Sequence, residues 1–214
     1  MEVDSPEWKR LIQDGAKEMG IHIGREQTEL CSLHAIELLR WARKINLTAI
    51  TDPEEMAVKH YLDSFAPAPW LPEDPPRLLD IGTGGGFPGI PLKIYCKAMP
   101  VTLIDAARKK TNFLKHVIRM LGLEKIEAIQ TRAKDMSPSG AFDIIVGRAV
   151  SNIPALCKMA SPLLASGGTI IAFLSKEEDG ERLKLTEPLY AIEIKPYVIP
   201  YLELRRALAL IRKR

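Results

Sequence analysis

From residue 77 onward, short apolar runs alternate with stretches of helical spacing, and this alternation restricts the fold more than any other feature. The apolar runs lie at 78–81, 101–104, 126–129, 142–146 and 169–174, and the helical stretches lie at about 89–97, 107–121 and 152–164. Runs that are apolar almost throughout are typical of strands buried on both faces of a parallel sheet with crossover helices. We therefore expect an α/β fold with a mostly parallel sheet.

The C-terminal segment has a different pattern. Residues 190–194 and 206–211 are β-like, Pro196 and Pro200 lie between them, and no convincing helix separates them. Two strands joined without a crossover helix pair antiparallel. The pattern predicts an antiparallel hairpin that closes one edge of the sheet.

The first part of the chain is predicted to be helical. Ser5-Pro6 is typical of a helix start, and Asp52-Pro53 begins a helical segment that reaches Phe65. Between them, apolar residues at near-helical spacing predict a helix over about residues 25–44. The proline-rich segment 67–76 opposes regular structure. We predict two modules, a helical N-terminal cap over residues 1–75 and an α/β domain over residues 76–214.

The distribution of charge and the number of cysteines indicate which class of partner and which cellular compartment to expect. The cap carries a net charge of −6 and the α/β domain one of +9, so the second module is the one that would attract a polyanion. The three cysteines form no CxxC pair, which favours a reducing, cytoplasmic compartment. The sequence has no secretory signal and no apolar stretch of ~20 residues. We expect a cytoplasmic monomer with no membrane partner and no metal.

A glycine-rich motif follows the first predicted strand. Asp80-Ile-Gly82-Thr-Gly84-Gly-Gly86 fits every fixed position of D/E-x-G-x-G-x-G, the pattern of an S-adenosylmethionine (SAM) site. Asp105 ends the next strand, where an acidic side chain can accept hydrogen bonds from ribose hydroxyls. The dinucleotide pattern G-x-G-x-x-G is met only from Gly84 through Gly86 to Gly89, later after the strand and with Pro88 inside it. A SAM site is favoured.

Longer motifs around this site resemble one family. The run from Leu78 to Leu92, LLDIGTGGGFPGIPL, occurs with NLTAI at 46–50, HYLDS at 60–64 and FDIIVGRAV at 142–150. Together these segments resemble ribosomal small-subunit methyltransferase G, also called the glucose-inhibited division protein B family. The resemblance implies a Rossmann-like class I SAM-dependent methyltransferase that modifies guanine N7 in the decoding-region loop of bacterial 16S rRNA. It implies as partner the small ribosomal subunit.

The resemblance also implies which residues bind SAM. These residues are Asp80, Gly82, Gly84, Gly86, Phe87, Asp105, Ala106, Ala133, Lys134 and Arg148. The family usually has an acidic residue where this chain has Lys134, and a lysine cannot accept a hydrogen bond from the adenine amino group. The contact therefore falls either to the backbone of Lys134 or to Asp135. The family also tends to have glycine after the lysine that corresponds to Lys176, and this chain has Glu177.

The implied chemistry needs no general base. Guanine N7 presents an unprotonated lone pair, so an in-line displacement can proceed by alignment and by stabilisation of the moving charge. The candidates for the catalytic centre are Arg148, at the end of the fourth strand, and His60 and Asp63, from the N-terminal part that would close over SAM as a lid. Local roles, such as a salt bridge for Arg148 and a helix-end contact for Asp63, remain open for each of them.

Candidates for RNA contact are polar or basic residues near the same edge of the sheet. They are Asn46, Arg108, Lys109, Lys110 and Lys176, with Trp70 and Tyr61 as possible stacking partners for a base. Two other functions stay open at this point. One is a SAM-dependent methyltransferase of a small molecule or protein, and the other is a non-catalytic ribosome assembly factor that retains SAM.

Overall fold

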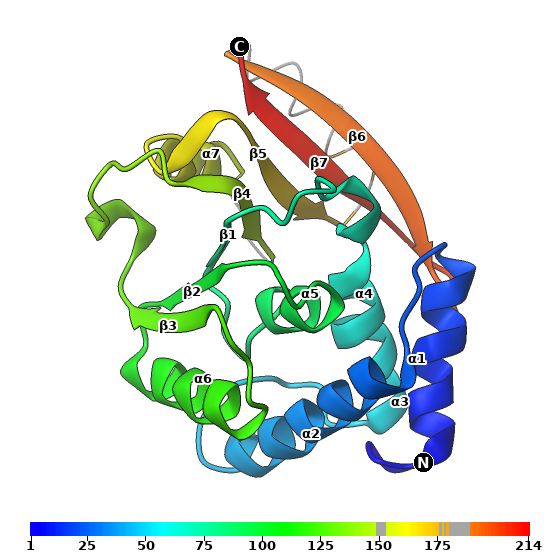
Figure 1. The fold of residues 1–214 in the computed structure, drawn as a ribbon. Coiled ribbons are helices and arrows are strands. Elements are labelled where there is room, and N and C mark those ends of the chain that lie inside the picture. The colour runs from blue at the N-terminus through cyan, green and yellow to red at the C-terminus, as the bar shows by residue number, and fades with distance from the viewer. Residues whose placement is uncertain (149–152, 176, 178, 180–188) are drawn as a thin grey trace.

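The computed structural model describes residues 1–148, 153–175, 177, 179 and 189–214. Its centre is a seven-stranded sheet with the order β3-β2-β1-β4-β5-β7-β6 (Figure 1). The strands are β1 (Leu78–Ile81), β2 (Val101–Asp105), β3 (Ile126–Gln130), β4 (Phe142–Gly147), β5 (Leu164–Leu174), β6 (Tyr190–Ile199) and β7 (Leu204–Lys213). Strands β1 to β5 pair in parallel, and β7 pairs antiparallel with both β5 and β6. The predicted parallel sheet and its C-terminal antiparallel hairpin are confirmed.

The crossover helices follow the predicted alternation with one change. They are α5 (Gly89–Tyr95), α6 (Arg108–Met120) and α7 (Ile153–Ala160). Helix α7 ends four residues before the predicted boundary at residue 164, because Leu164 already pairs with Phe142 as the first residue of β5. The strand is therefore longer at its start than the apolar run suggested.

The hairpin is also longer than predicted. Pro196 does not lie between two strands but inside β6, in register with Ala207. The position is compatible with proline because β6 is the edge strand of the sheet, and an edge strand has one side on which no neighbouring strand needs a backbone donor. Pro200 does lie at the end of β6, next to the turn that leads into β7.

Helices α1 (Pro6–Glu18) and α2 (Arg25–Ala42) lie where the sequence predicts them. Ser5 caps α1, since its hydroxyl accepts a hydrogen bond from the Trp8 backbone at 3.2 Å. The apolar stripe expected for α2 is only partly the buried one: Leu33 is 43% exposed, whereas small or polar residues face the interior. Small side chains such as Cys31 and Ala35 let α2 approach its neighbours closely.

The third helical segment is not a single α-helix. Its consecutive parts are α3 (Pro53–Met56), the π-helix η1 (Ala57–Leu62) and α4 (Asp63–Phe65). Asp52 caps its start by accepting a hydrogen bond from the Glu55 backbone at 2.9 Å. The proline-rich segment that follows contains one 3-10 turn, η2 (Ala68–Trp70), which corrects the expectation that it has no regular structure. A proline at the first turn of such a helix loses no hydrogen bond.

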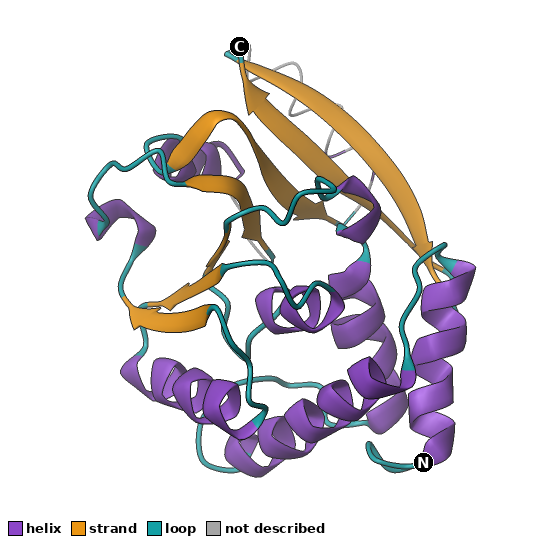
Figure 2. Cartoon of the chain, viewed as in Figure 1, coloured by secondary structure: helices purple, strands orange, loops and turns teal. Residues whose placement is uncertain are grey.

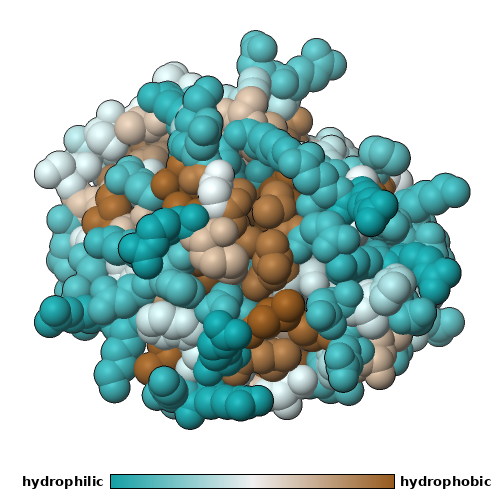
Figure 3. All heavy atoms as spheres, turned by 60° about the horizontal axis from the view of Figure 1, so that its bottom comes forward, coloured by the Kyte–Doolittle hydropathy of each residue, from teal (hydrophilic) through white to brown (hydrophobic). Residues whose placement is uncertain are grey.

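Helices cover both faces of the sheet (Figure 2). One hydrophobic cluster joins the N-terminal helices, α5 and α6 to one face, with Trp8, Phe65 and Phe113 fully buried in it. A second cluster packs α7, through Leu156 and Cys157, on the other face. Apolar side chains gather on one surface of the molecule as well, the surface that faces the reader in Figure 3. No helix in the described residues is long and apolar enough to cross a membrane.

Candidate functional site

The glycine-rich loop begins directly at the carboxyl end of β1. Gly82 and Gly84 have φ angles of +72° and +58°, and a Cβ atom built on Gly82 would meet no atom within 4 Å. At Gly86 and Gly89 a Cβ atom would approach Ile90 Cδ1 to 2.4 Å and Leu103 Cδ2 to 2.3 Å. The first two glycines therefore border open space, and the last two allow the loop to pack against the protein.

Two carboxylates organise this loop. Asp80 is fully buried, and its Oδ2 accepts hydrogen bonds from Thr83 Oγ1 at 2.6 Å and from the Gly89 backbone at 2.8 Å. Burial raises the pKa of Asp80 to about 6, against the hydrogen bonds from Thr83 and Gly89 that lower it. Asp80 Oδ1 is buried without a hydrogen-bond partner among the described residues. Asp80 thus holds the glycine-rich loop through its Oδ2 atom.

Asp105 lies at the carboxyl end of β2, next to the loop. Its Oδ2 accepts a hydrogen bond from the Gly84 backbone at 3.1 Å, and its Oδ1 accepts one from the Ala107 backbone at 2.8 Å. Lys110 Nζ lies 4.0 Å from Oδ2. Ala106, the next residue, is exposed. The structure therefore brings the predicted ribose-binding acid and the glycine loop into direct contact.

The remaining predicted cofactor residues follow β3. Ala133 is buried at the start of the short 3-10 helix η3 (Ala133–Asp135), and Lys134 and Asp135 are exposed. Parallel strands β1, β2 and β3 end at the same edge of the sheet. Ligands of open α/β sheets bind outside this carboxyl edge.

Arg148, the residue after β4, is held by the N-terminal helical segment. Its Nη1 donates to the Lys59 carbonyl at 3.2 Å, to Ser64 Oγ at 3.4 Å and to Asp63 Oδ2 at 3.5 Å. Its Nη2 donates to His60 Nδ1 at 3.2 Å. Of the three residues predicted for the catalytic centre, Arg148 thus contacts both His60 and Asp63, although it lies more than 80 residues from either.

His60 is neutral and its tautomer follows from its partners. Nδ1 accepts from Arg148, so the proton is on Nε2, which donates to Thr48 Oγ1 at 2.7 Å. Burial, together with the nearby charge of Arg148, lowers the pKa of His60 to about 3. The imidazole stacks on the ring of Phe87, and the guanidinium of Arg148 lies 5.1 Å from the same ring.

Asp63 is the carboxylate at the other side of this cluster. It is buried, and its Oδ1 accepts a hydrogen bond from the Tyr197 hydroxyl at 2.7 Å. Arg206 Nε lies 3.7 Å from the same oxygen. Tyr197 and Arg206 are not predicted from the sequence, because nothing in the spacing indicates that the C-terminal hairpin reaches the N-terminal helices.

A second buried network holds the middle of the glycine loop and was also missed. The Gly85 carbonyl can only accept, so His34 donates to it through Nε2 at 2.9 Å and accepts from the Tyr61 hydroxyl on Nδ1 at 3.0 Å. Burial lowers the pKa of His34 to about 4. Tyr61 is fully buried, which corrects its assignment as a possible stacking partner for a base. The available signal was a histidine in the middle of a predicted helix.

Those of the predicted RNA-contact residues that the structure describes lie at the surface. Asn46, Arg108 and Lys109 are exposed, and Lys110 is half-buried beside Asp105. Lys176 lies outside the described residues. Trp70 is 42% exposed, and Lys195 Nζ lies 4.1 Å from the centre of its ring.

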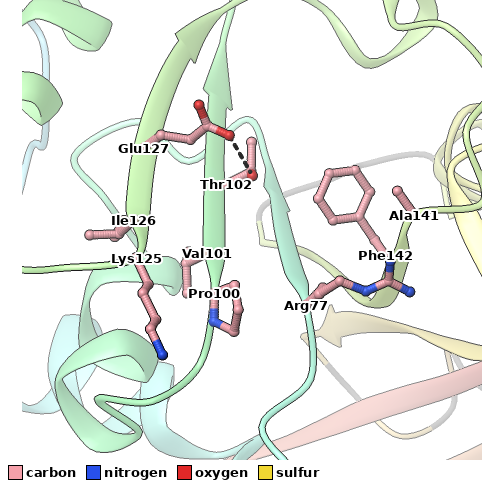
Figure 4. Close-up of a pocket in the computed structure, with 9 residues that line it drawn as sticks. All are labelled: Arg77, Pro100, Val101, Thr102, Lys125, Ile126, Glu127, Ala141 and Phe142. Carbon is pink, nitrogen blue, oxygen red and sulfur yellow. Dashed lines mark hydrogen bonds between the residues drawn. The ribbon is translucent and has the colours of Figure 1, made fainter.

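A separate hollow of about 560 Å³ opens at the opposite edge of the sheet. Its lining residues come from the amino ends of β1 to β4, and Figure 4 shows Thr102 donating to Glu127 along one side of it. None of the predicted site residues lines it. Within the described part of the chain, no group of three His, Cys, Asp or Glu side chains could hold a metal ion.

Comparison with known proteins shows that most of the chain matches one protein family. The family model described as rRNA small subunit methyltransferase G matches residues 27–209. A ribosomal RNA small subunit methyltransferase G from Geobacter sulfurreducens is 43% identical over 199 residues, which cover 90% of this chain and 91% of the relative. Another, from Geotalea uraniireducens, is 46% identical over 166 residues, which cover 77% and 75%. These matches confirm the resemblance found in the motifs.

Solved structures share the fold at low sequence identity. M. jannaschii TYW2 in complex with AdoMet has a TM-score of 0.57 and 17% identity, with coverage of 78% of this chain and 79% of that one. A SAM-dependent methyltransferase from Aquifex aeolicus has a TM-score of 0.58 and 14% identity, with coverage of 75% and 93%. The Rossmann-like methyltransferase fold predicted from the sequence is confirmed.

Proposed function

Because this chain belongs to the rRNA small subunit methyltransferase G family, we propose that it transfers a methyl group from SAM to N7 of a guanine in 16S rRNA. The observation that carries the proposal is the contact between Asp105 and the open glycine loop, at the edge where Arg148 also lies. This arrangement suits a nucleoside cofactor on one side and a substrate base on the other.

The residues at this edge fit SAM. The open space at Gly82 and Gly84 admits a ligand close to the backbone, and Asp105 is a carboxylate that can accept from ribose hydroxyls. Asp80 and Gly86 maintain the loop, and the exposed Ala106, the buried Ala133 and Lys134 follow the neighbouring strands. The proposed SAM-binding set is Asp80, Gly82, Gly84, Gly86, Phe87, Asp105, Ala106, Ala133, Lys134 and Arg148.

When bound, SAM supplies a methyl group on a positively charged sulfur, and transfer breaks the carbon–sulfur bond as the bond to N7 forms. The protein does not have to remove a proton, because N7 already presents a lone pair. His60 agrees with this requirement: both of its ring nitrogens are engaged, and its low pKa keeps it neutral. We assign His60 and Asp63 to holding Arg148 and Phe87 in place rather than to proton transfer.

The N-terminal helices are proposed to act as a cap over the site. Among the described residues, the segment from Lys59 to Ser64 supplies the hydrogen-bond acceptors of Arg148, and its His60 covers Phe87. Water exclusion by such a cap strengthens the electrostatic interactions at the reacting atoms. The module boundary at residues 75 and 76 is part of this proposal.

The partner is proposed to be the small ribosomal subunit, bound by the protein as a monomer in the cytoplasm. Exposed basic residues next to the cofactor site supply contacts to the RNA backbone. The proposed contacts are Asn46, Arg108, Lys109, Lys110 and Lys176.

The test is transfer of labelled methyl from SAM to small subunits isolated from cells that lack this gene, followed by nucleoside analysis. Labelled N7-methylguanosine in 16S rRNA is the expected product. Label on a different atom or on a protein would contradict the assigned target. SAM binding without transfer to any assembly state of the subunit would indicate an assembly factor instead of an enzyme.

A further inference from the structure

Two arginines approach the buried carboxylate of Asp63 from its two oxygens. Arg148 Nη1 lies 3.5 Å from Oδ2, and Arg206 Nε lies 3.7 Å from Oδ1, the oxygen that also accepts from Tyr197. One carboxylate therefore faces two guanidinium groups. His60 is neutral and adds no charge to these groups.

The two arginines differ in how many hydrogen-bond acceptors the described residues offer to their guanidinium groups. Arg148 donates to four acceptors from the segment between Lys59 and Ser64, and its side chain is 17% exposed. Arg206 makes no hydrogen bond within the described residues; its Nε is buried, and its side chain is 31% exposed. Burial closes Nε to a ligand, so a ligand would have to reach the exposed part of the Arg206 side chain, for which the described residues supply no hydrogen-bond acceptor.

The hairpin places Arg206 at the carboxyl edge of the sheet. Ala207 pairs with Leu174, the last residue of β5, so Arg206 lies just beyond the end of that strand. Arg206 is also in register with Tyr197 on β6. The end of β6 reaches the N-terminal helices in Figure 1, and the contacts of Tyr197 and Arg206 with Asp63 connect this hairpin to the site.

We propose that Arg206 binds a backbone phosphate of the substrate RNA beside the target guanine, while the donors of Arg148 are engaged by the segment from Lys59 to Ser64. The inference rests on the proposed function. A guanidinium matches a phosphate through two parallel N–H donors. The other common arginine contact, a bidentate pair with guanine O6 and N7, is blocked for the target base because N7 must accept the methyl group.

The chain offers a matched control one residue away. Arg205 is exposed and precedes Arg206 in β7, so its side chain points to the other face of the strand. Arg206→Ala and Arg205→Ala therefore remove the same charge from neighbouring positions. Both variants are compared with the wild type for binding to small ribosomal subunits isolated from cells that lack this gene, over a series of salt concentrations, and for SAM binding by calorimetry.

Loss of one phosphate contact by Arg206→Ala is expected to weaken RNA binding about tenfold or more and to reduce the slope of log K against log salt by about 0.7–0.9. Arg205→Ala should change the affinity less than about twofold and leave the slope near that of the wild type. SAM affinity should be unchanged in both. Arg206→Lys, which keeps the charge, should retain the wild-type slope and recover part of the affinity.

Equal slopes for Arg206→Ala and the wild type would overturn the proposal, because a base contact or a structural role removes no counterion release. Equal effects of Arg206→Ala and Arg205→Ala would also overturn it, since they would indicate overall charge. A wild-type protein that leaves rRNA unmethylated refutes the proposed function itself. Methylation by the wild type together with an unchanged Arg206→Ala variant refutes only the assignment of Arg206.

Discussion

The imidazole of His60 lies parallel to the ring of Phe87, with ring centroids 4.5 Å apart and an interplanar angle of 15°. Phe87 directly follows the glycine loop, and His60 belongs to the π-helix of the N-terminal segment. The stack is thus a direct contact between the N-terminal helical segment and the glycine-rich loop. Because the imidazole is neutral, it adds no charge beside Arg148, which lies against the same phenyl ring.

Replacement of Phe87 by leucine should weaken SAM binding more than it weakens the fold. Leucine keeps most of the buried volume but removes the stack on His60, which contributes about 0.5–1.5 kcal/mol beyond area burial. Phe113→Leu is the matched control, because Phe113 is fully buried and contacts His34 but lies in α6, outside the loop. Calorimetry and urea unfolding separate the effects. Equal SAM affinities for the two variants would contradict a loop-specific role of Phe87.

Replacement of Gly82 by alanine should reduce SAM binding, whereas replacement of Gly89 by alanine should reduce stability. At Gly82 the added Cβ meets open space but requires a positive φ and enters the ligand side, so SAM binding should fail in a protein that still folds. At Gly89 the Cβ would lie 2.3 Å from Leu103 Cδ2 and 2.7 Å from Asp80 Oδ2. Overpacking of this kind costs about 1–3 kcal/mol of stability. Thermal unfolding with and without SAM measures both, and a Gly82→Ala variant with normal SAM affinity would contradict the assignment.

Stability should fall as the pH drops below about 6.5. Burial lowers the pKa of His60 to about 3 and that of His34 to about 4, from an ordinary value of 6.5. The unfolded chain therefore binds protons at these groups that the folded chain does not bind, and their contribution to stability is lost progressively toward pH 3. Asp80, whose pKa is raised to about 6, contributes in the opposite direction between about pH 4 and 6.

The measurement is urea unfolding at several pH values between 7.5 and 5. His60→Asn should make the free energy of unfolding less dependent on pH, because it removes one of the two neutral buried imidazoles. His22→Asn is the control, since His22 is exposed. A pH dependence that is the same for wild type and His60→Asn would show that His60 is not held neutral by the fold.

Lys134→Glu should strengthen SAM binding about 2- to 10-fold, the effect of one additional hydrogen bond. Lys134 is exposed directly after the buried Ala133, and its ammonium group cannot accept from an adenine amino group, whereas a carboxylate can. Lys134→Met separates the new acceptor from the loss of positive charge. If the methionine variant binds SAM as tightly as the glutamate variant, the gain comes from charge alone.

The local part of the site could be predicted from the sequence. Asp80, Gly82 and Gly84 are close in the chain, and their pattern after an apolar run specifies a strand, a turn and a helix. Asp105 could be added because parallel neighbouring strands end at one edge of the sheet. The same logic placed Arg148 at the end of β4. The glycine loop is set within one strand–helix unit, and Asp105 and Arg148 follow from the shared edge of neighbouring parallel strands.

The sequence by itself determined the alternation of strands and helices, the glycine loop and the hairpin, because hydrophobic period and turn chemistry act over a few residues. Only the tertiary structure decided that Asp63 meets Tyr197 and Arg206, 134 residues and more away, and that His34 supports Gly85. It also decided that Pro196 is accommodated at an edge. Such contacts depend on how helices and strands pack against one another. The spacing of residues along the chain does not indicate which distant residues this packing brings together.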